Sequence, residues 1–197
     1  MRKPILFVLA AAVLAAVATL PAIAADDAAP AMPAVGQNAP TFTLPSQDGS
    51  PISLKSLHGK WVVLYFYPRA DTPGCTTQAC GVRDHSADYA SANAVVLGVS
   101  PDPVGKIKKF HDKHSLGFPL LADEDHAVAE SYGVWVEKSM YGRTYWGNER
   151  TTFVIDRDGR IARVLRKVKP AAHDKRIRSP ARTPATFGAS RTAFSRV

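Results

Sequence analysis

The sequence predicts an α/β protein with a mixed sheet that is covered on both faces. Apolar runs of strand length alternate with segments of helical periodicity, which is the pattern of α/β folds. The run Trp61–Tyr67 is apolar on both faces, as in a central strand with layers above and below it. The last two strand-like runs are joined by Asp158-Gly159, a hairpin signal, so the sheet should contain an antiparallel pair.

Each expected element has its own local signal. Phe42–Leu44 and Ile52–Leu54 alternate around a Gln-Asp-Gly-Ser turn and predict a small N-terminal hairpin. Asp102-Pro103 should open a helix that turns Ile107 and Phe110 toward the core. The remaining expectations are strands at 61–67, 94–100, 118–122, 151–156 and 161–165, a helix from 75 to about 90, and a helix capped by Asp125.

The N-terminus has the pattern of a secretory signal. Arg2 and Lys3 precede the apolar run Ile5–Ala18, and Ala22-Ile23-Ala24 matches a small-x-small cleavage site. A membrane anchor is the alternative, but the run is shorter than the roughly 20 residues of a spanning helix. We therefore predict a signal peptide at residues 1–24, export to the periplasm, and no stable membrane insertion after cleavage.

The positive charge of the chain is concentrated at its C-terminal end. Residues 26–162 hold 13 basic and 16 acidic side chains, whereas residues 163–197 hold 10 basic side chains and only Asp174 as an acid. The globular part gives no reason to expect nucleic-acid binding. We predict a linker at 25–37, a single domain at 38–168, and a basic, largely disordered tail at 169–197, since the tail lacks apolar periodicity.

The only two cysteines, Cys75 and Cys80, follow a strand and fall at the expected start of a helix. A helix N-terminus favours the thiolate, so Cys75 is the expected nucleophile. The hydroxyl of Thr72 could meet the sulfur or a bound oxygen, and Pro68 stiffens the loop. Arg150 could supply a cation if its strand runs antiparallel to Trp61–Tyr67.

The five-residue spacing excludes a disulfide between the two cysteines while the helix is wound. Their Cα atoms would lie roughly 8.7 Å apart on an ideal helix, and a disulfide tolerates at most about 7 Å. A redox bridge therefore requires the first turns to unwind. A structural disulfide and a zinc site remain alternatives, although the closed loop would be short and His85 is the only histidine nearby.

At these residues the sequence resembles the peroxiredoxins, in particular the bacterioferritin comigratory protein or peroxiredoxin Q group. Pro68, Thr72 and Cys75 match the family pattern Pro-x-x-x-Thr/Ser-x-x-Cys, and Cys80 matches the second cysteine of this group. The resemblance covers about residues 35 to 168. It continues through 81–84, 98–102, 118–123, 132–134 and 150–156.

The resemblance implies a thioredoxin-like fold and reduction of hydrogen peroxide or organic hydroperoxides. It implies that Cys75 is the peroxidatic cysteine, that Cys80 resolves its sulfenic acid as an intramolecular disulfide, and that Arg150 holds the thiolate. Thr72 would orient the peroxide, and Pro68 would shield the sulfenic acid from water. A thioredoxin-like dithiol would be the reductant, with no metal and no cofactor, and we expect a monomer.

Two features leave room for other interpretations. Members of this group usually end in an amphipathic helix, which is replaced here by the basic tail, so we expect an exposed sheet face and a weakened fold. The aromatic segment Trp135–Trp146 could border a substrate cleft or pack locally. The competing functions are a general thiol-disulfide oxidoreductase of the periplasm and a redox-sensing module.

Overall fold

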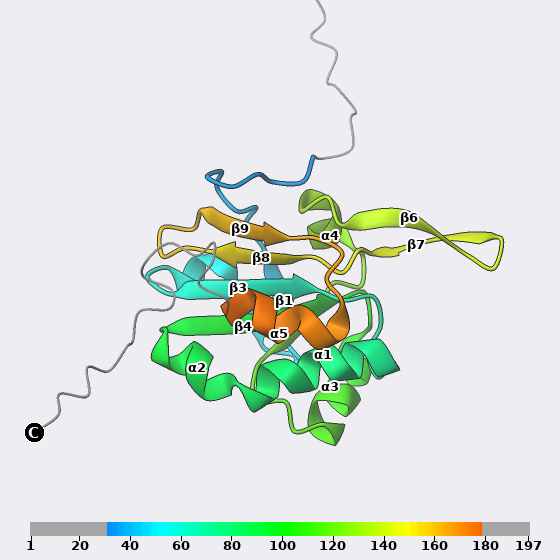
Figure 1. Cartoon of the computed structure of the whole chain (residues 1–197), viewed down its shortest axis with the longest axis horizontal. Helices are drawn as coiled ribbons and strands as arrows, with labels where there is room; N and C mark the ends of the chain where they lie inside the picture. Colours follow the sequence, from blue (N-terminus) through cyan, green and yellow to red (C-terminus); the bar gives the residue numbers. More distant parts are fainter. Residues whose placement is uncertain (1–30, 179–197) are drawn as a thin grey trace, which may run out of the picture.

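The computed structural model of the chain describes residues 31–178 and centres on a five-stranded mixed sheet (Figure 1). Three strands run parallel, and the last two are antiparallel to their neighbours. The antiparallel pairing of the last two with each other is the one that the Asp158-Gly159 turn predicts. The sheet order is β5 (Leu120–Ala122), β4 (Ala94–Ser100), β3 (Trp61–Phe66), β8 (Thr152–Ile155) and β9 (Ile161–Leu165).

The central strand β3 divides the hydrophobic core in two, because successive side chains point to opposite faces of the sheet. Val63 and Tyr65 belong to one core, and Val62 and Leu64 belong to the other. The first face is covered by α1 (Pro73–Asp84), α2 (Ser86–Ser91) and α3 (Val104–Lys113). The second is covered by α4 (Ala127–Ser131), the 3-10 helix η1 (Leu54–Leu57), and the hairpin of β1 (Thr43–Pro45) and β2 (Pro51–Ser53).

Two helices differ in detail from their predictions. The helix expected from Cys75 to about residue 90 is interrupted at His85, which separates α1 from α2. The cap of α4 comes mainly from Asp123, whose carboxylate accepts the backbone N–H of Ala129 at 2.8 Å and a second one at 3.1 Å. Asp125, the predicted cap, reaches only one amide, at 3.3 Å.

The prediction that the domain ends at residue 168 is wrong, because ten further residues are folded against it. Pro170–Ala172 forms the 3-10 helix η2, and His173–Arg178 forms the helix α5, which lies beside α1 (Figure 1). His173 and Ile177 are completely buried. Short as it is, α5 therefore covers part of the sheet face that the sequence suggested was bare. The rest of the predicted tail, 179–197, lies outside the described residues.

The predicted linker also ends earlier than expected. The backbone N–H of Gly36 donates to the carbonyl of Ile161, and the N–H of Ile161 donates to the carbonyl of Gln37, both at 2.8 Å. These bonds tie the segment to the edge strand β9. The predicted signal peptide and residues 25–30 lie outside the described range. Within residues 31–178, no helix is long and apolar enough to cross a membrane.

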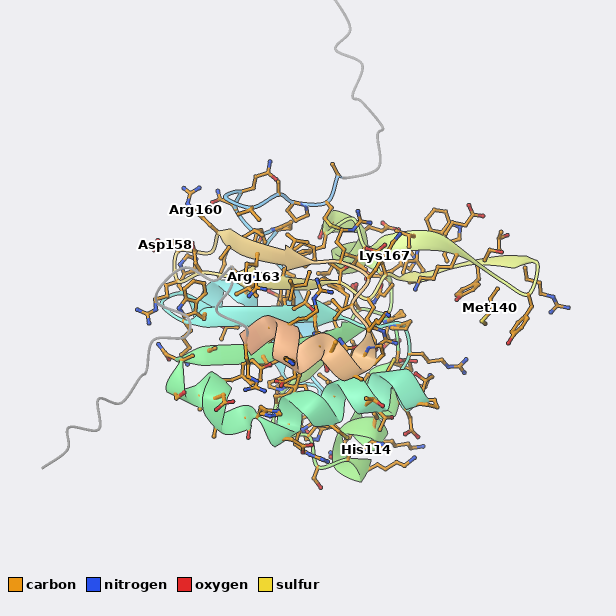
Figure 2. The ribbon with its side chains drawn as sticks, viewed as in Figure 1. His114, Met140, Asp158, Arg160, Arg163 and Lys167 are labelled. Carbon is orange, nitrogen blue, oxygen red and sulfur yellow. The ribbon has the colours of Figure 1, made fainter. Side chains whose placement is uncertain are left out.

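The aromatic segment forms a second hairpin that projects from the body of the molecule (Figure 1). Its strands are β6 (Trp135–Met140) and β7 (Arg143–Asn148), and among residues 31–178 they pair only with each other. Lys167 lies near the base of this hairpin, and Met140 lies near its free end (Figure 2). The sequence did not predict these strands.

Candidate active site

Cys75 lies in the first turn of α1, immediately beyond the end of the central strand. Thr72 occupies the N-cap position and Pro73 opens the helix, where a missing N–H costs nothing. The first-turn N–H groups of a helix have no partner within it, and their partial positive charge favours an anion. Cys75 is 2% exposed and unbridged, so this is a shielded, reduced thiol.

Arg150 reaches Cys75 because β8 runs antiparallel to β3. The register pairs Tyr65 with Thr152, and the N–H of Phe66 donates to the carbonyl of Thr151 at 2.9 Å. One more step along both chains brings Arg150 level with the end of β3, where the loop to α1 begins. One guanidinium nitrogen of Arg150 donates to the Cys75 sulfur at 3.3 Å. The sequence predicted this contact only if the strand of Arg150 ran antiparallel to Trp61–Tyr67, and the structure meets that condition.

Gln78 is a contact that the sequence interpretation missed. Its side-chain oxygen accepts a hydrogen bond from the other terminal nitrogen of Arg150. Gln78 is one turn beyond Cys75 on the same face of α1, so the helix presents the sulfur and the amide to the guanidinium together. The three-residue spacing between Cys75 and Gln78 could have indicated that the two side chains share a face of the helix.

The charge of Arg150 is not neutralised by a carboxylate anywhere in residues 31–178. The adjacent Glu149 turns away, and its carboxylate accepts hydrogen bonds from Arg166 at 2.9 and 3.1 Å. Burial would raise the pKa of Glu149, but the hydrogen bonds from Arg166 and Thr151 outweigh burial and hold the pKa below its usual value. The guanidinium therefore keeps its positive charge available to the sulfur.

Lys138, on the projecting hairpin, adds a second cation near Arg150. Burial lowers the pKa of Lys138, and repulsion from Arg150 lowers it further. Its ammonium group donates to the backbone carbonyl of Asn148, and the Asn148 side chain donates to the carbonyl of Tyr67 at 3.3 Å. These bonds connect the hairpin to the chain on both sides of the site.

The loop before α1 is anchored from the neighbouring strand. The carboxylate of Asp102, just after β4, accepts the backbone N–H of Ala70 at 2.6 Å. The half-buried Pro68 lies in this loop. The hydroxyl of Thr72 donates to the carbonyl of Arg69 at 3.1 Å, so it closes the loop on itself. The structure therefore places Pro68 and Thr72 in the loop beside Cys75, and their predicted roles toward a peroxide stay predictions.

Cys80 lies farther along the same helix and is partly exposed. Because α1 is continuous from Pro73 to Asp84, ideal helix geometry separates the two cysteine Cα atoms by roughly 8.7 Å. Both cysteines are free thiols in this conformation. A disulfide between Cys75 and Cys80 therefore cannot form while the helix has this conformation.

A buried polar cluster underlies the site and was not foreseen. The Nε2 atom of His173 lies 2.8 Å from the hydroxyl oxygen of Thr152, and its ring packs on Tyr65 with a centroid distance of 5.2 Å. Burial lowers the pKa of His173 to about 3, so the imidazole is neutral at ordinary pH. Burial also raises the pKa of Tyr65. The two rings are therefore buried, uncharged and packed against each other beneath the site.

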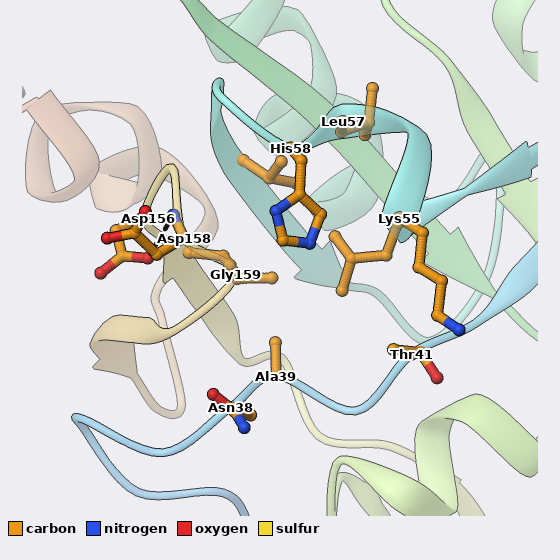
Figure 3. A pocket seen from close by; sticks show the side chains of 12 residues that line it. Asn38, Ala39, Thr41, Lys55, Leu57, His58, Asp156, Asp158 and Gly159 are labelled. Atoms are coloured by element: carbon orange, nitrogen blue, oxygen red, sulfur yellow. Dashed lines mark hydrogen bonds between the residues drawn. The ribbon is translucent and has the colours of Figure 1, made fainter.

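A cavity lies at the opposite end of the strands, far from the sulfur. Its volume is about 250 Å³, and His58 points into it between Lys55 and the Asp156–Gly159 turn (Figure 3). It contains no cysteine. Within residues 31–178, no three side chains of His, Cys, Asp or Glu are grouped so that they could hold a metal ion.

Comparison with known proteins agrees with this fold and site. A family model described as the AhpC/TSA family matches residues 35–164. Peroxiredoxin Bcp of Escherichia coli K12 is 49% identical over 138 residues, which are 70% of this chain and 88% of that protein. Peroxiredoxin Bcp of Bacillus subtilis is 47% identical over 139 residues, which are 71% and 88% of the two chains.

Solved structures give the same result. Peroxiredoxin Q of Xanthomonas campestris superposes with a TM-score of 0.66 at 37% identity, covering 69% of this chain and 86% of that one. A mutant PrxQ of Xylella fastidiosa gives a TM-score of 0.71 at 31% identity, covering 75% and 94%. The fold is thus the thioredoxin-like peroxiredoxin fold.

The site and the fold together define an enzyme of the peroxidase class. The chain belongs to the AhpC/TSA family, and its relatives carry the names Bcp and peroxiredoxin Q. The predicted family and fold class are confirmed.

Proposed function

We propose that this protein reduces hydrogen peroxide and organic hydroperoxides with Cys75 as the attacking group. The observation that carries the proposal is the 3.3 Å contact between the Cys75 sulfur and the guanidinium of Arg150 at the first turn of α1. A thiolate is the nucleophilic form of cysteine, and both the helix start and the guanidinium stabilise it. A related X. campestris structure is described by its alkyl peroxide reduction activity, which supports the substrate class.

In the first step the Cys75 thiolate attacks one peroxide oxygen. A sulfur–oxygen bond forms as the oxygen–oxygen bond breaks, so sulfur is oxidised to sulfenic acid and keeps one oxygen. The other oxygen departs with its substituent, takes up a proton and is released as water or an alcohol. Arg150 stabilises the negative charge that develops on the departing oxygen. Gln78 fixes the orientation of the guanidinium through its hydrogen bond.

In the second step the thiol of Cys80 condenses with the sulfenic acid. A disulfide forms and water is released. Because roughly 8.7 Å separates the two Cα atoms in the wound helix, the first turns of α1 must unwind before the bond can form. Thr72 makes no side-chain cap hydrogen bond to the helix, so unwinding of the first turn breaks no such bond.

A dithiol reductant of the thioredoxin type then returns both cysteines to thiols and leaves oxidised itself. We further propose that the enzyme works as a monomer in the periplasm after its signal is removed. The N-terminal sequence supports export, and mass analysis of the mature protein from a cell fractionation tests it. A mature protein that retains residues 1–24 and stays with the cytoplasm would overturn that placement.

Peroxide consumption with a dithiol reductant tests the catalytic proposal. Cys75→Ser should abolish turnover, whereas Cys80→Ser should still reduce one peroxide per molecule and accumulate sulfenic acid. Gln78→Leu, which preserves the approximate shape without the amide, should slow the first step and leave the disulfide exchange unchanged. Turnover that survives Cys75→Ser would refute the assignment. Strong reduction of insulin disulfides would favour the general oxidoreductase.

A further inference from the structure

The exposed apolar side chains of the described residues are concentrated on one element. Five large apolar side chains are exposed between residues 31 and 178, and four belong to the β6–β7 hairpin: Met140, Tyr141, Tyr145 and Trp146. Tyr141 is 97% exposed and Trp146 is 60% exposed. Isolated exposed apolar residues are ordinary, but four within seven residues of a projecting ribbon indicate a contact surface.

The two faces of this ribbon differ in charge. Residues directly opposite each other in an antiparallel pair share a face, so Lys138 lies with Tyr145 and Met140 lies with Arg143. The only acid of the hairpin, Glu137, is paired with Trp146 and therefore belongs to the other face. One face thus combines aromatic, aliphatic and basic side chains without a carboxylate.

The basic face continues into the active site. A cleft of about 610 Å³ extends from the base of the hairpin to Arg150 and is also lined by Tyr145, Lys138 and Lys167. Glu137 and Glu149 border it as well, but Glu149 is paired with Arg166. A molecule that sits on the hairpin therefore lies at the entrance to the cleft that is lined by Arg150, the hydrogen-bond partner of Cys75.

The size of the surface indicates what it contacts. A stable protein interface buries on the order of 800 Å² from each partner and involves roughly 20–30 residues on each side. The tip of a two-stranded ribbon with four apolar side chains is much smaller than that. A bilayer needs less surface, because Trp and Tyr are favoured at the headgroup level and nearby Lys and Arg are attracted to anionic lipids.

We propose that the β6–β7 hairpin docks this enzyme on anionic phospholipid surfaces. Tyr141 at the turn, with Met140 and Tyr145 on the face without a carboxylate, would enter the headgroup region, and Arg143 on the same face would contact lipid phosphates. Docking holds the cleft beside Arg150 against the surface, where hydroperoxides of membrane lipids are presented. The catalytic consequence rests on the proposed peroxidase function, but the binding itself does not.

Vesicle binding of the full chain tests the docking. The double variant Met140→Ser/Tyr141→Ser should bind equimolar phosphatidylcholine–phosphatidylglycerol vesicles about tenfold more weakly in co-sedimentation, because two apolar side chains no longer reach the bilayer. The matched control is Val35→Ser, which removes an apolar side chain that is 64% exposed elsewhere and should bind as the wild type does. Arg143→Gln should weaken binding only when the anionic lipid is present.

Turnover separates docking from catalysis. The double variant should lose about tenfold with phosphatidylcholine hydroperoxide held in the same vesicles and keep its rate with hydrogen peroxide in solution. Vesicle binding equal to that of the wild type would overturn the docking proposal. Equal losses with both substrates would assign the hairpin to the reductant, and a lost self-association in sedimentation would assign it to a second copy. A wild type without peroxide turnover would count against the proposed function alone.

Discussion

Two segments flank the Cys75–Arg150 pair, and they are attached to the molecule in opposite ways. The segment Pro170–Arg178 is mostly polar, yet it is fixed against α1, α2 and the sheet (Figure 1). The β6–β7 hairpin is rich in aromatic side chains, yet most of it projects into solvent. From average hydrophobicity alone, one would have expected the hairpin to be buried and the polar segment to be exposed.

The difference lies in where a few side chains find partners. In α5, Ile177 fills the core, and the carboxylate of Asp174 accepts hydrogen bonds from Tyr89 at 2.9 Å and from Arg178 at 2.7 Å. Arg178 also pairs with Asp88 on α2 at 2.7 Å. The tip of the hairpin has no comparable partners in the described part of the chain. A short, mostly polar segment can thus be fixed by one buried apolar side chain, Ile177, and by the hydrogen bonds and ion pairs around Asp174 and Arg178.

Removing the attached segment should have the largest effect. A chain that stops after Val168 loses Ile177 from the core and leaves Thr152 without its His173 partner, so we expect a loss of at least about 3–5 kcal/mol in the free energy of unfolding. Such a loss is a large part of an ordinary stability. Urea unfolding of this chain and of one that stops after Arg178 measures it. Equal midpoints would show that α5 contributes nothing.

Acid should loosen the same segment through His173. Its pKa is about 3 in the folded protein against 6.5 for an ordinary histidine, so between these values the unfolded chain binds a proton that the folded chain does not. Stability should therefore fall as the pH drops from about 6.5 toward 3, by up to about 1.4 kcal/mol for each pH unit. His173→Asn should flatten this slope in urea unfolding series, and an unchanged slope would assign it to other groups.

Loss of the Asp174 charge should have an intermediate effect. Asp174→Asn keeps the shape but leaves the half-buried Arg178 without its main partner, and we expect a loss of about 1–3 kcal/mol. Asp112→Asn on α3 is the matched control, because Asp112 pairs with Lys108 at the surface, where solvent screens the pair, and its loss should lower the stability much less. Similar losses in thermal unfolding of the two variants would remove the distinction between buried and surface networks.

The hairpin tip should have the smallest effect on stability. Tyr141→Ser changes a side chain that is almost fully exposed, so the free energy of unfolding should stay within about 0.5 kcal/mol of the wild type. Thermal unfolding measures this directly. A larger loss would mean that the tip packs against the protein itself, and the contrast between the two segments would then disappear.

Much of the core and the candidate site could be predicted from residue patterns. The run Trp61–Tyr67 predicted the central strand because its apolar side chains fill both cores, and the Asp158-Gly159 turn predicted an antiparallel pair. A different pairing, that of β8 antiparallel to β3, brings Arg150 to Cys75, and the sequence predicted it only as a condition. Gln78 was missed, because a glutamine on a helix has no special meaning until its neighbour is known.

The sequence by itself indicated the candidate site: a cysteine at a helix start, a second one five residues on, and a basic residue at the head of a strand. These are local signals that depend on the chain near each residue. Only the tertiary structure decided that His173 and Ile177 are buried and that the aromatic hairpin is exposed. Burial depends on which surfaces meet in space. The six-residue helix α5 can pack on the core because the hydroxyl groups of Tyr89 and Thr152 lie where Asp174 and His173 can form hydrogen bonds with them.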